Sequence, residues 1–350
     1  MERENCYAVF NDGARVEEPV LRILKRYAPN GHLSVLACDQ DASFRKMLRG
    51  FFANCRNAGG NIEDYPAVPQ DKHVAILSRM LARTLGRGHR AALFNQLGFT
   101  QGGFREDLGP DTMLLGRLED TNPLKGSDGG LVAQLAITPE EATQFVDGFK
   151  ILVKVDPECP ESWAANIAWL EEVDVRCRAL GKPLFVETLY TPADDVSKLE
   201  TASRLPGALL KIAMAFSHFG TFYKTQVPKA WVEGKVVGNS GGIRTNISFM
   251  AGLIKRPLLI LSAAVDFDQY FLQFAAVADL AVGPMCGRAY FQDPFSDPKI
   301  TSWDALAEAV AATALPRMKH IQGIMERLGQ PWWACFKEIS PEAKELLGLN

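Results

Sequence analysis

Short apolar segments alternate with amphipathic segments about eight times along the chain. The apolar segments have the length and composition of buried strands, and the intervening segments have the apolar spacing of helices. Such alternation is typical of a parallel sheet covered by helices. We expect strands at residues 32–38, 89–95, 113–119, 148–156, 182–187, 207–214, 256–262 and 279–283.

Eight strand–helix units within roughly 260 residues match a (β/α)8 barrel, the TIM barrel. The competing architecture, a doubly wound sheet, would carry a glycine fingerprint in its first strand–helix turn. The first turn here, residues 39–43, reads Asp-Gln-Asp-Ala-Ser and has no glycine. We therefore predict a single-domain α/β TIM barrel over residues 31–335, with an N-terminal cover at 1–30 and a C-terminal helical tail at 336–350.

Composition narrows the partners of this chain. The formal net charge is −3, without the basic surplus of a nucleic-acid-binding protein. No apolar run approaches the roughly 20 residues of a membrane span, and residues 1–5 are polar and charged, unlike a signal peptide. Seven cysteines form no C-x-x-C pair, which favours a reducing compartment. We expect a cytoplasmic protein with a small-molecule partner, no nucleic acid, no membrane and a possible homo-oligomeric state.

A lysine lies within one of the predicted strands. The run 207–214 is apolar except for Lys211. Burial disfavours the charged form of lysine and lowers its pKa, and a neutral amine is a nucleophile toward carbonyl carbon. Lys211 is thus a candidate for Schiff-base catalysis. The alternative is a lysine at the end of the strand that reaches water or pairs with a carboxylate.

Charged residues also end several other predicted strands. Asp39, Glu119 and Glu187 follow or close strands, and Lys150 lies early in the strand 148–156. Active residues of (β/α)8 enzymes stand at the carboxyl ends of the strands. Glu119 and Glu187 are candidate general acid/base groups, and Lys150 could lower the pKa of Lys211 by like-charge repulsion. The alternative is a set of salt bridges at the barrel rim.

An anion site is expected after the last two strands, where such barrels often hold a phosphate. Ser262 follows the seventh predicted strand, and Gly287 with Arg288 follows the eighth. Arginine offers bidentate hydrogen bonds to a phosphate. The alternative is a capping serine and a surface arginine. The glycine-rich segment 238–242 lacks P-loop spacing and is interpreted as an ordinary loop.

The histidines do not indicate a metal site. The chain has five of them, and none forms an H-x-H or H-x-x-x-H pair. A metal-dependent aldol mechanism is therefore disfavoured, and we predict no metal and no cofactor. Magnesium bound by carboxylates stays an open alternative.

Taken together and in this order, six segments resemble the class I tagatose-1,6-bisphosphate aldolases and their sulfofructose-phosphate aldolase relatives. The similarity spans roughly residues 33–335. The segments are 36–40 (LACDQ), 149–152 (FKIL), 185–187 (FVE), 209–212 (LLKI), 261–265 (LSAAV) and 286–289 (CGRA).

The resemblance implies a lyase of carbohydrate metabolism. It would cleave a phosphorylated ketose, such as tagatose 1,6-bisphosphate, to dihydroxyacetone phosphate and an aldehyde. Lys211 would form the Schiff base, Glu187 would be the main acid/base group and Lys150 would contact substrate or set a pKa. The other implied site residues shape the site or hold a phosphate, and they are Asp39, Gln40, Glu119, Ser262, Gly287 and Arg288.

The chain departs from the family pattern in places. Asp41 stands where the family has arginine, Ala264 replaces a glycine of the phosphate loop, and residues 215–256 match poorly. The alternative functions are therefore an aldolase for sulfofructose phosphate or another sugar phosphate, and a non-catalytic barrel that senses sugar phosphates.

Overall fold

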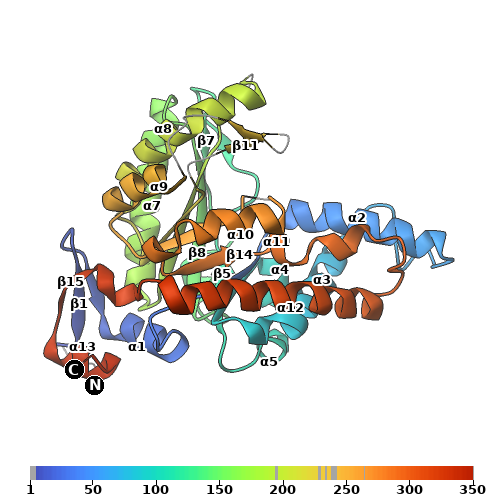
Figure 1. The fold of residues 1–350 in the computed structure, drawn as a ribbon, viewed down its shortest axis with the longest axis horizontal. Helices are drawn as coiled ribbons and strands as arrows, with labels where there is room; N and C mark the ends of the chain where they lie inside the picture. Colours follow the sequence, from blue (N-terminus) through green and yellow to red (C-terminus); the bar gives the residue numbers. More distant parts are fainter. Residues whose placement is uncertain are drawn as a thin grey trace.

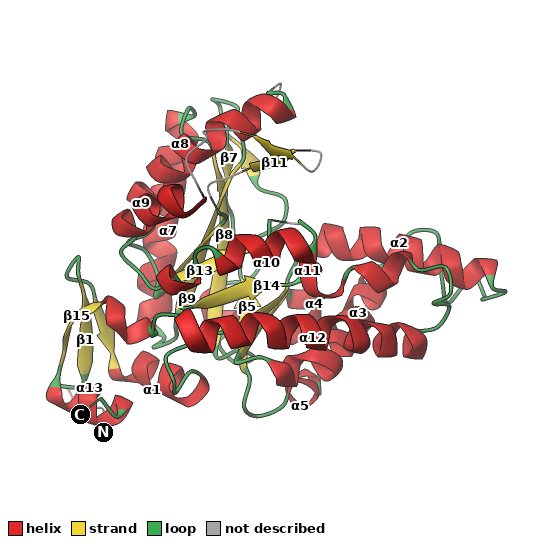
Figure 2. Cartoon of the chain, in the orientation of Figure 1, coloured by secondary structure: helices red, strands yellow, loops and turns green. Residues whose placement is uncertain are grey.

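The computed structural model describes residues 5–193, 196–227, 230–232, 235–237, 243–263 and 265–349. Eight parallel strands close into a barrel in the order β10-β13-β14-β3-β4-β5-β8-β9, with helices around it (Figures 1 and 2). The predicted (β/α)8 barrel is confirmed. Its strands are β3 (Val35–Cys38), β4 (Ala91–Phe94), β5 (Met113–Arg117), β8 (Gly148–Val155), β9 (Leu184–Tyr190), β10 (Phe222–Thr225), β13 (Leu258–Leu261) and β14 (Gly283–Cys286).

Helices connect and cover the strands, and short two-stranded ribbons join β6 (Leu124–Lys125) to β7 (Leu131–Val132) and β11 (Ala230–Val232) to β12 (Lys235–Val237). In the described part of the chain, no helix has the length and apolarity that crossing a membrane requires. The helices are α1 (Glu18–Tyr27), α2 (Asp41–Asn57), α3 (Asp71–Leu85), α4 (Gln96–Phe99), α5 (Phe104–Leu108), α6 (Pro139–Ala142), α7 (Pro160–Ala179), α8 (Lys198–Phe216), α9 (Ile243–Leu253), α10 (Phe267–Ala275), α11 (Arg288–Phe291), α12 (Trp303–Leu328) and α13 (Pro341–Leu347).

Alternation along the strands divides the apolar side chains between two cores. On β3, Leu36 and Cys38 belong to the layer between sheet and helices, whereas Val35 and Ala37 face the barrel interior. The interior is filled rather than open, and the rings of Phe185 and Phe222 stack with centroids 4.6 Å apart. Because side chains close this interior, chemistry must occur at the ends of the strands.

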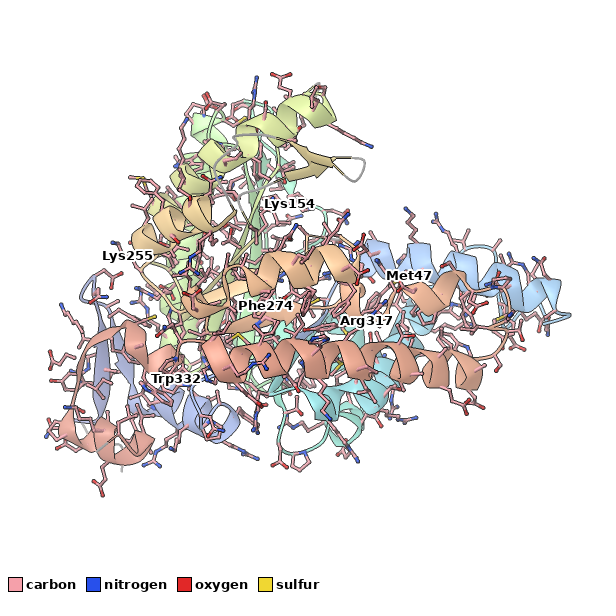
Figure 3. The ribbon with its side chains drawn as sticks, in the orientation of Figure 1. Met47, Lys154, Lys255, Phe274, Arg317 and Trp332 are labelled. Carbon is pink, nitrogen blue, oxygen red and sulfur yellow. The ribbon has the colours of Figure 1, made fainter. Side chains whose placement is uncertain are left out.

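Both ends of the described chain meet beside the barrel (Figure 1). The strands β15 (Phe336–Ile339), β1 (Tyr7–Phe10) and β2 (Arg15–Glu17) form an antiparallel sheet in that order. Trp332 is buried between this sheet and the barrel (Figure 3), where its indole Nε1 donates to the Ala28 carbonyl at 3.1 Å. The helical tail predicted at 336–350 is thus wrong in part, because a strand precedes α13.

Two predicted strands are also wrong. Residues 207–214 belong to α8, which contains Pro206 and buries Leu205, Leu209, Ile212 and Phe216 at helical spacing. The sixth barrel strand is instead β10, within the connection 215–256. The eighth strand is β14, whereas Ala278–Leu280 forms a 3-10 turn. Burial of an apolar face overrides the local tendency of proline and glycine to end a helix.

Candidate active site

Charged side chains from neighbouring strands converge at the carboxyl end of the barrel. Lys150 on β8 is fully buried, and its Nζ lies 2.8 Å from Asp39 Oδ2, 2.9 Å from Glu119 Oε1 and 2.9 Å from Glu187 Oε2. Asp39 follows β3, Glu119 follows β5 and Glu187 lies on β9. The sequence-based expectation that these strand ends meet is correct for these four residues.

The cluster fixes the charge of Lys150. Burial lowers the pKa of Lys150, but the charges of Asp39, Glu119 and Glu187 outweigh burial and raise it above the ordinary value. Burial likewise works against ionised Asp39, yet Lys150, Lys224 and Arg117 lower the pKa of Asp39 to about 2. Lys150 is therefore an ammonium ion held by carboxylates, and a protonated amine is no nucleophile.

The two glutamates of the cluster differ. Burial would raise the pKa of Glu187, but the charges of Lys150 and Lys224 lower it below the usual value. For Glu119, burial dominates over the attraction of Lys150 and Arg117, and its pKa is raised. Among the described residues, no group of histidine, cysteine or carboxylate side chains is arranged to hold a metal ion.

A second buried lysine stands beside the first. Lys224 on β10 is 2% exposed, and its Nζ lies 2.9 Å from Glu187 Oε2. In the described structure, Glu187 is the one carboxylate within ion-pair distance of Lys224. This lysine was not among the site residues predicted from the sequence. Its signal was the short run Phe222–Thr225, whose aromatic and β-branched residues are typical of a strand.

Lys224 opens onto a cavity of about 320 Å³, which we call the Lys224 cavity. It brings together most of the predicted site, including the residues proposed for an anion. It is lined by Asp39, Gln40, Lys150, Leu152, Glu187, Leu189, Tyr190, Thr191, Lys224, Gln226, Leu261, Ser262, Ala263, Met285, Gly287 and Arg288.

The local structure explains the positions of Gly287 and Arg288. Gly287 follows β14, and a Cβ there would lie 1.9 Å from the carbonyl oxygen of Ala37, so the backbone approach requires glycine. Arg288 begins α11, and its guanidinium donates to Ser43 Oγ at 3.0 Å. Ala264 and residues 238–242 lie outside the described residues.

A smaller cavity of about 180 Å³ adjoins the first, and both are lined by Asp39, Gln40 and Leu152. We call it the Glu119 cavity. Lys154, labelled on β8 in Figure 3, lines it, and Lys150 of the same strand lines the Lys224 cavity. Its other lining residues are Asp41, Ala42, Ser43, Arg117, Glu119, Asp120, Thr121, Pro123 and Ala133.

Lys211 lies elsewhere. It is on α8, its side chain is 60% exposed, and its Nζ lies 2.9 Å from Glu158 Oε1, which is itself exposed. The prediction that Lys211 is a buried strand lysine is wrong, because an exposed helix position and a burying strand position can share the same local apolar pattern. Lys211 lines neither cavity.

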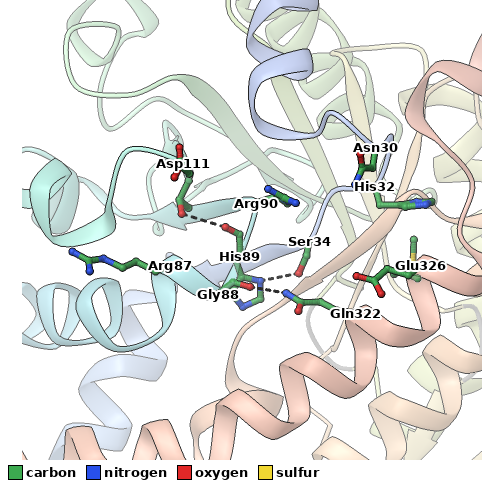
Figure 4. A pocket seen from close by; sticks show the side chains of 12 residues that line it. Asn30, His32, Ser34, Arg87, Gly88, His89, Arg90, Asp111, Gln322 and Glu326 are labelled. Atoms are coloured by element: carbon green, nitrogen blue, oxygen red, sulfur yellow. Dashed lines mark hydrogen bonds between the residues drawn. The ribbon is translucent and has the colours of Figure 1, made fainter. Parts of the chain in front are cut away.

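A third cavity, of about 360 Å³ (Figure 4), lies at the opposite end of the barrel. It is lined by residues that precede β3, β4 and β5 and by residues of α12, and part of its polar lining is internally bonded. Ser34 Oγ and His89 Nδ1 are 2.8 Å apart, and Gln322 donates to the Gly88 carbonyl at 2.6 Å (Figure 4). Residues at this end of a (β/α)8 barrel serve stability, so we do not assign the chemistry here.

Comparisons with known proteins agree with this placement of the strands. Among solved structures, a fructose-bisphosphate aldolase from Slackia heliotrinireducens has a TM-score of 0.53 at 15% identity, covering 91% of this chain and 96% of that one. A Schiff base-forming fructose-1,6-bisphosphate aldolase has a TM-score of 0.50 at 15% identity, covering 84% of this chain and 98% of that one. At these identities the likeness concerns the fold.

Sequence comparison points to related proteins. No family model matches the chain. It is 25% identical over 325 residues to proteins named tagatose 1,6-diphosphate aldolase from Listeria monocytogenes and Listeria innocua, covering 87% of this chain and 91% of each of those. The predicted resemblance is confirmed: along most of its length, this chain is similar to the tagatose 1,6-diphosphate aldolases.

Proposed function

We propose that the protein is a class I aldolase that cleaves a phosphorylated ketose to dihydroxyacetone phosphate and an aldehyde, through a Schiff base on Lys224. One observation carries this proposal. Two buried lysines share Glu187, and only one of them, Lys150, is surrounded by three carboxylates. The other is the nucleophile.

Glu187 is the proposed acid/base group. Its Oε2 lies 2.9 Å from both Lys150 and Lys224, so it adjoins any carbonyl carbon bonded to the Lys224 amine. Glu187 takes a proton from Lys224, attack by the resulting neutral amine gives a carbinolamine, and loss of water from it gives an iminium ion. A proton must reach the departing hydroxyl group, and a side chain at hydrogen-bond distance can supply it.

Cleavage follows from the iminium ion. Glu187 removes the proton of the hydroxyl group at C4, the C3–C4 bond breaks, and its electrons pass into the iminium to form an enamine while the aldehyde leaves. Protonation of the enamine at C3 and hydrolysis of the resulting iminium release dihydroxyacetone phosphate and return the free lysine. Lys150, kept positive by its three carboxylates, stabilises negative charge that develops on oxygen during these steps.

The phosphate group of the substrate binds, in this proposal, to the part of the Lys224 cavity that Ser262 and Arg288 line. Ser262 and Arg288 follow β13 and β14, the positions that hold phosphate in many barrels of this kind. Arg288 supplies a charge that matches phosphate geometry. The names of the related Listeria proteins, which refer to a phosphorylated ketose, support a sugar phosphate as substrate.

Borohydride trapping tests the nucleophile directly. The protein is reduced in the presence of dihydroxyacetone phosphate and digested, and the modified peptide is identified by mass spectrometry. We expect the adduct on Lys224. An adduct on Lys211 or Lys150 would refute the assignment, and absence of any adduct, together with absence of turnover, would refute the function.

Matched lysine variants separate the mechanism from a general effect of charge. Lys224→Met is expected to abolish cleavage, whereas Lys211→Met, which removes an exposed ion pair, should leave turnover near that of the unmodified protein. Full activity of Lys224→Met would show that this lysine forms no essential covalent bond.

A further inference from the structure

The two adjoining cavities carry opposite charge. In the Lys224 cavity, the cations Lys150, Lys224 and Arg288 outnumber the carboxylates Asp39 and Glu187. In the Glu119 cavity, acidic side chains outnumber basic ones two to one, and the acidic set is Asp39, Asp41, Glu119 and Asp120. An elongated ligand that spans both cavities therefore meets a positive wall at one end and a negative wall at the other.

The buried wall of the Glu119 cavity also has unused hydrogen-bond acceptors. Asp39 and Glu119 are 3% and 4% exposed, and Asp39 Oδ1 and Glu119 Oε2 have no hydrogen-bond partner among the described residues. The same holds for the buried oxygens Gln40 Oε1 and Asp41 Oδ1. Buried polar atoms without a partner are costly and rare, so their concentration here indicates a ligand that donates hydrogen bonds.

The two cations that line this cavity, Arg117 and Lys154, face four carboxylates. Arg117 donates to the main-chain carbonyl of Asp39 and adds to the positive charge that lowers the pKa of that carboxyl group. Arg45, which does not line the cavity, lies 3.9 Å from Asp41 Oδ2 and also pairs with Asp71. A phosphate group placed here would meet more carboxylates than cations, whereas hydroxyl groups would satisfy the acceptors.

We propose that the Glu119 cavity binds the uncharged, hydroxyl-bearing end of the substrate, so that the substrate is a ketose 1-phosphate rather than a ketose bisphosphate. The phosphate end lies at Ser262 and Arg288, and the hydroxyl groups beyond the cleaved bond donate to the oxygens of Asp41 and Glu119. This inference rests on the proposed function. Asp41 is the sequence position that reflects this difference in substrate, because the family that this chain resembles has an arginine there.

Condensation kinetics test the proposal. Dihydroxyacetone phosphate is supplied with either glyceraldehyde, as both enantiomers, or glyceraldehyde 3-phosphate, and kcat/KM is measured for each aldehyde. We expect kcat/KM to be at least about tenfold higher for glyceraldehyde. A preference for glyceraldehyde 3-phosphate would overturn the proposal.

Charge variants provide the matched controls. Asp41→Arg should shift the ratio toward glyceraldehyde 3-phosphate by at least about tenfold, and Asp41→Asn should shift it in the same direction by less. Glu63→Arg makes the same charge change at an exposed position outside both cavities and should leave the ratio unchanged. Equal ratios in the unmodified protein and both Asp41 variants would refute the role given to Asp41.

Separate measurements distinguish failure of the proposed aldolase function from failure of the present inference. If no borohydride adduct forms and no aldehyde condenses, the aldolase function is wrong. Titration calorimetry with fructose 1-phosphate and fructose 1,6-bisphosphate then still decides the present inference. Tighter binding of the monophosphate, weakened by Asp41→Arg, would support it, and tighter binding of the bisphosphate would overturn it.

Discussion

Replacing Lys150 with methionine tests whether the central cluster is ionised as described. Each of its three contacts, at 2.8–2.9 Å, corresponds to about 6 kcal/mol of attraction at an effective dielectric constant of about 20. Desolvation of the four charged groups cancels most of that attraction. Removal of one partner from a buried ion pair typically costs about 3–5 kcal/mol, because the remaining charge is left uncompensated. We expect Lys150→Met to lower the free energy of unfolding by about 4 kcal/mol at pH 7.5.

The pH dependence of this loss has a definite sign. In the unmodified protein, the pKa values of Asp39 and Glu187 are lowered, so their contribution is present above the ordinary carboxyl values and is lost as the pH falls through the folded-state values. In Lys150→Met, the carboxylates lack their main counter-ion and take up protons at higher pH. The difference between the two proteins should therefore be largest near neutral pH and should shrink as the pH is lowered.

Urea unfolding, followed by circular dichroism at several pH values, measures both effects. Lys154→Met is the matched control, since it removes a lysine from the same strand but outside the three carboxylates, and it should cost less than about 1 kcal/mol. If Lys150→Met were no less stable than Lys154→Met at pH 7.5, the description of Lys150 as a buried ammonium ion held by three carboxylates would be refuted.

Three further predictions concern other residues. Gly287→Ala should destabilise the protein by about 3 kcal/mol or more in urea unfolding, because its Cβ would meet the Ala37 carbonyl, whereas Gly323→Ala in α12, with no neighbouring atom within 4 Å, should not destabilise it. Glu187→Gln should lower kcat by about 10²–10⁴-fold while borohydride still traps dihydroxyacetone phosphate on Lys224 at a lower rate, and a kcat equal to that of the unmodified protein would contradict the acid/base role. Burial lowers the pKa of His89 to about 3, so the folded protein should lose stability as the pH falls below the ordinary histidine value of 6.5. His89→Gln should reduce that loss between about pH 6.5 and 4. An unchanged pH dependence of the free energy of unfolding in His89→Gln would contradict this prediction.

The sequence predicted the barrel because its strands and helices differ in length and in apolar spacing. Strands such as β5 and β8 are mostly apolar runs, and the helix α12 has a regular apolar face, so tertiary packing agrees with the local pattern there. The pattern failed where local and tertiary preferences conflict. Pro206 lies inside α8, and Pro284 lies inside β14, two positions that local rules assign to element ends.

The same conflict explains which site residues were found. Asp39, Glu119 and Glu187 stand at or just after the ends of runs that the pattern identifies, so their convergence follows from barrel geometry. Lys224 lies on β10, a strand of four residues of which two, Lys224 and Thr225, are polar. A run this short and polar has little periodicity of apolar residues. The choice between Lys211 and Lys224 depends on which run is the sixth strand, and only long-range pairing of β10 with β9 and β13 decides that.

The sheet that joins the two ends of the chain also bears on how the protein is made. Tyr7 on β1 reaches Glu338 on β15, 331 positions away in sequence. During synthesis, β1 leaves the ribosome long before its partner exists, and its outer edge stays unpaired until residues 336–339 emerge. Unpaired strand edges recruit other chains. A nascent chain therefore exposes an unpaired edge of β1, at which other chains can pair, until β15 has been synthesised.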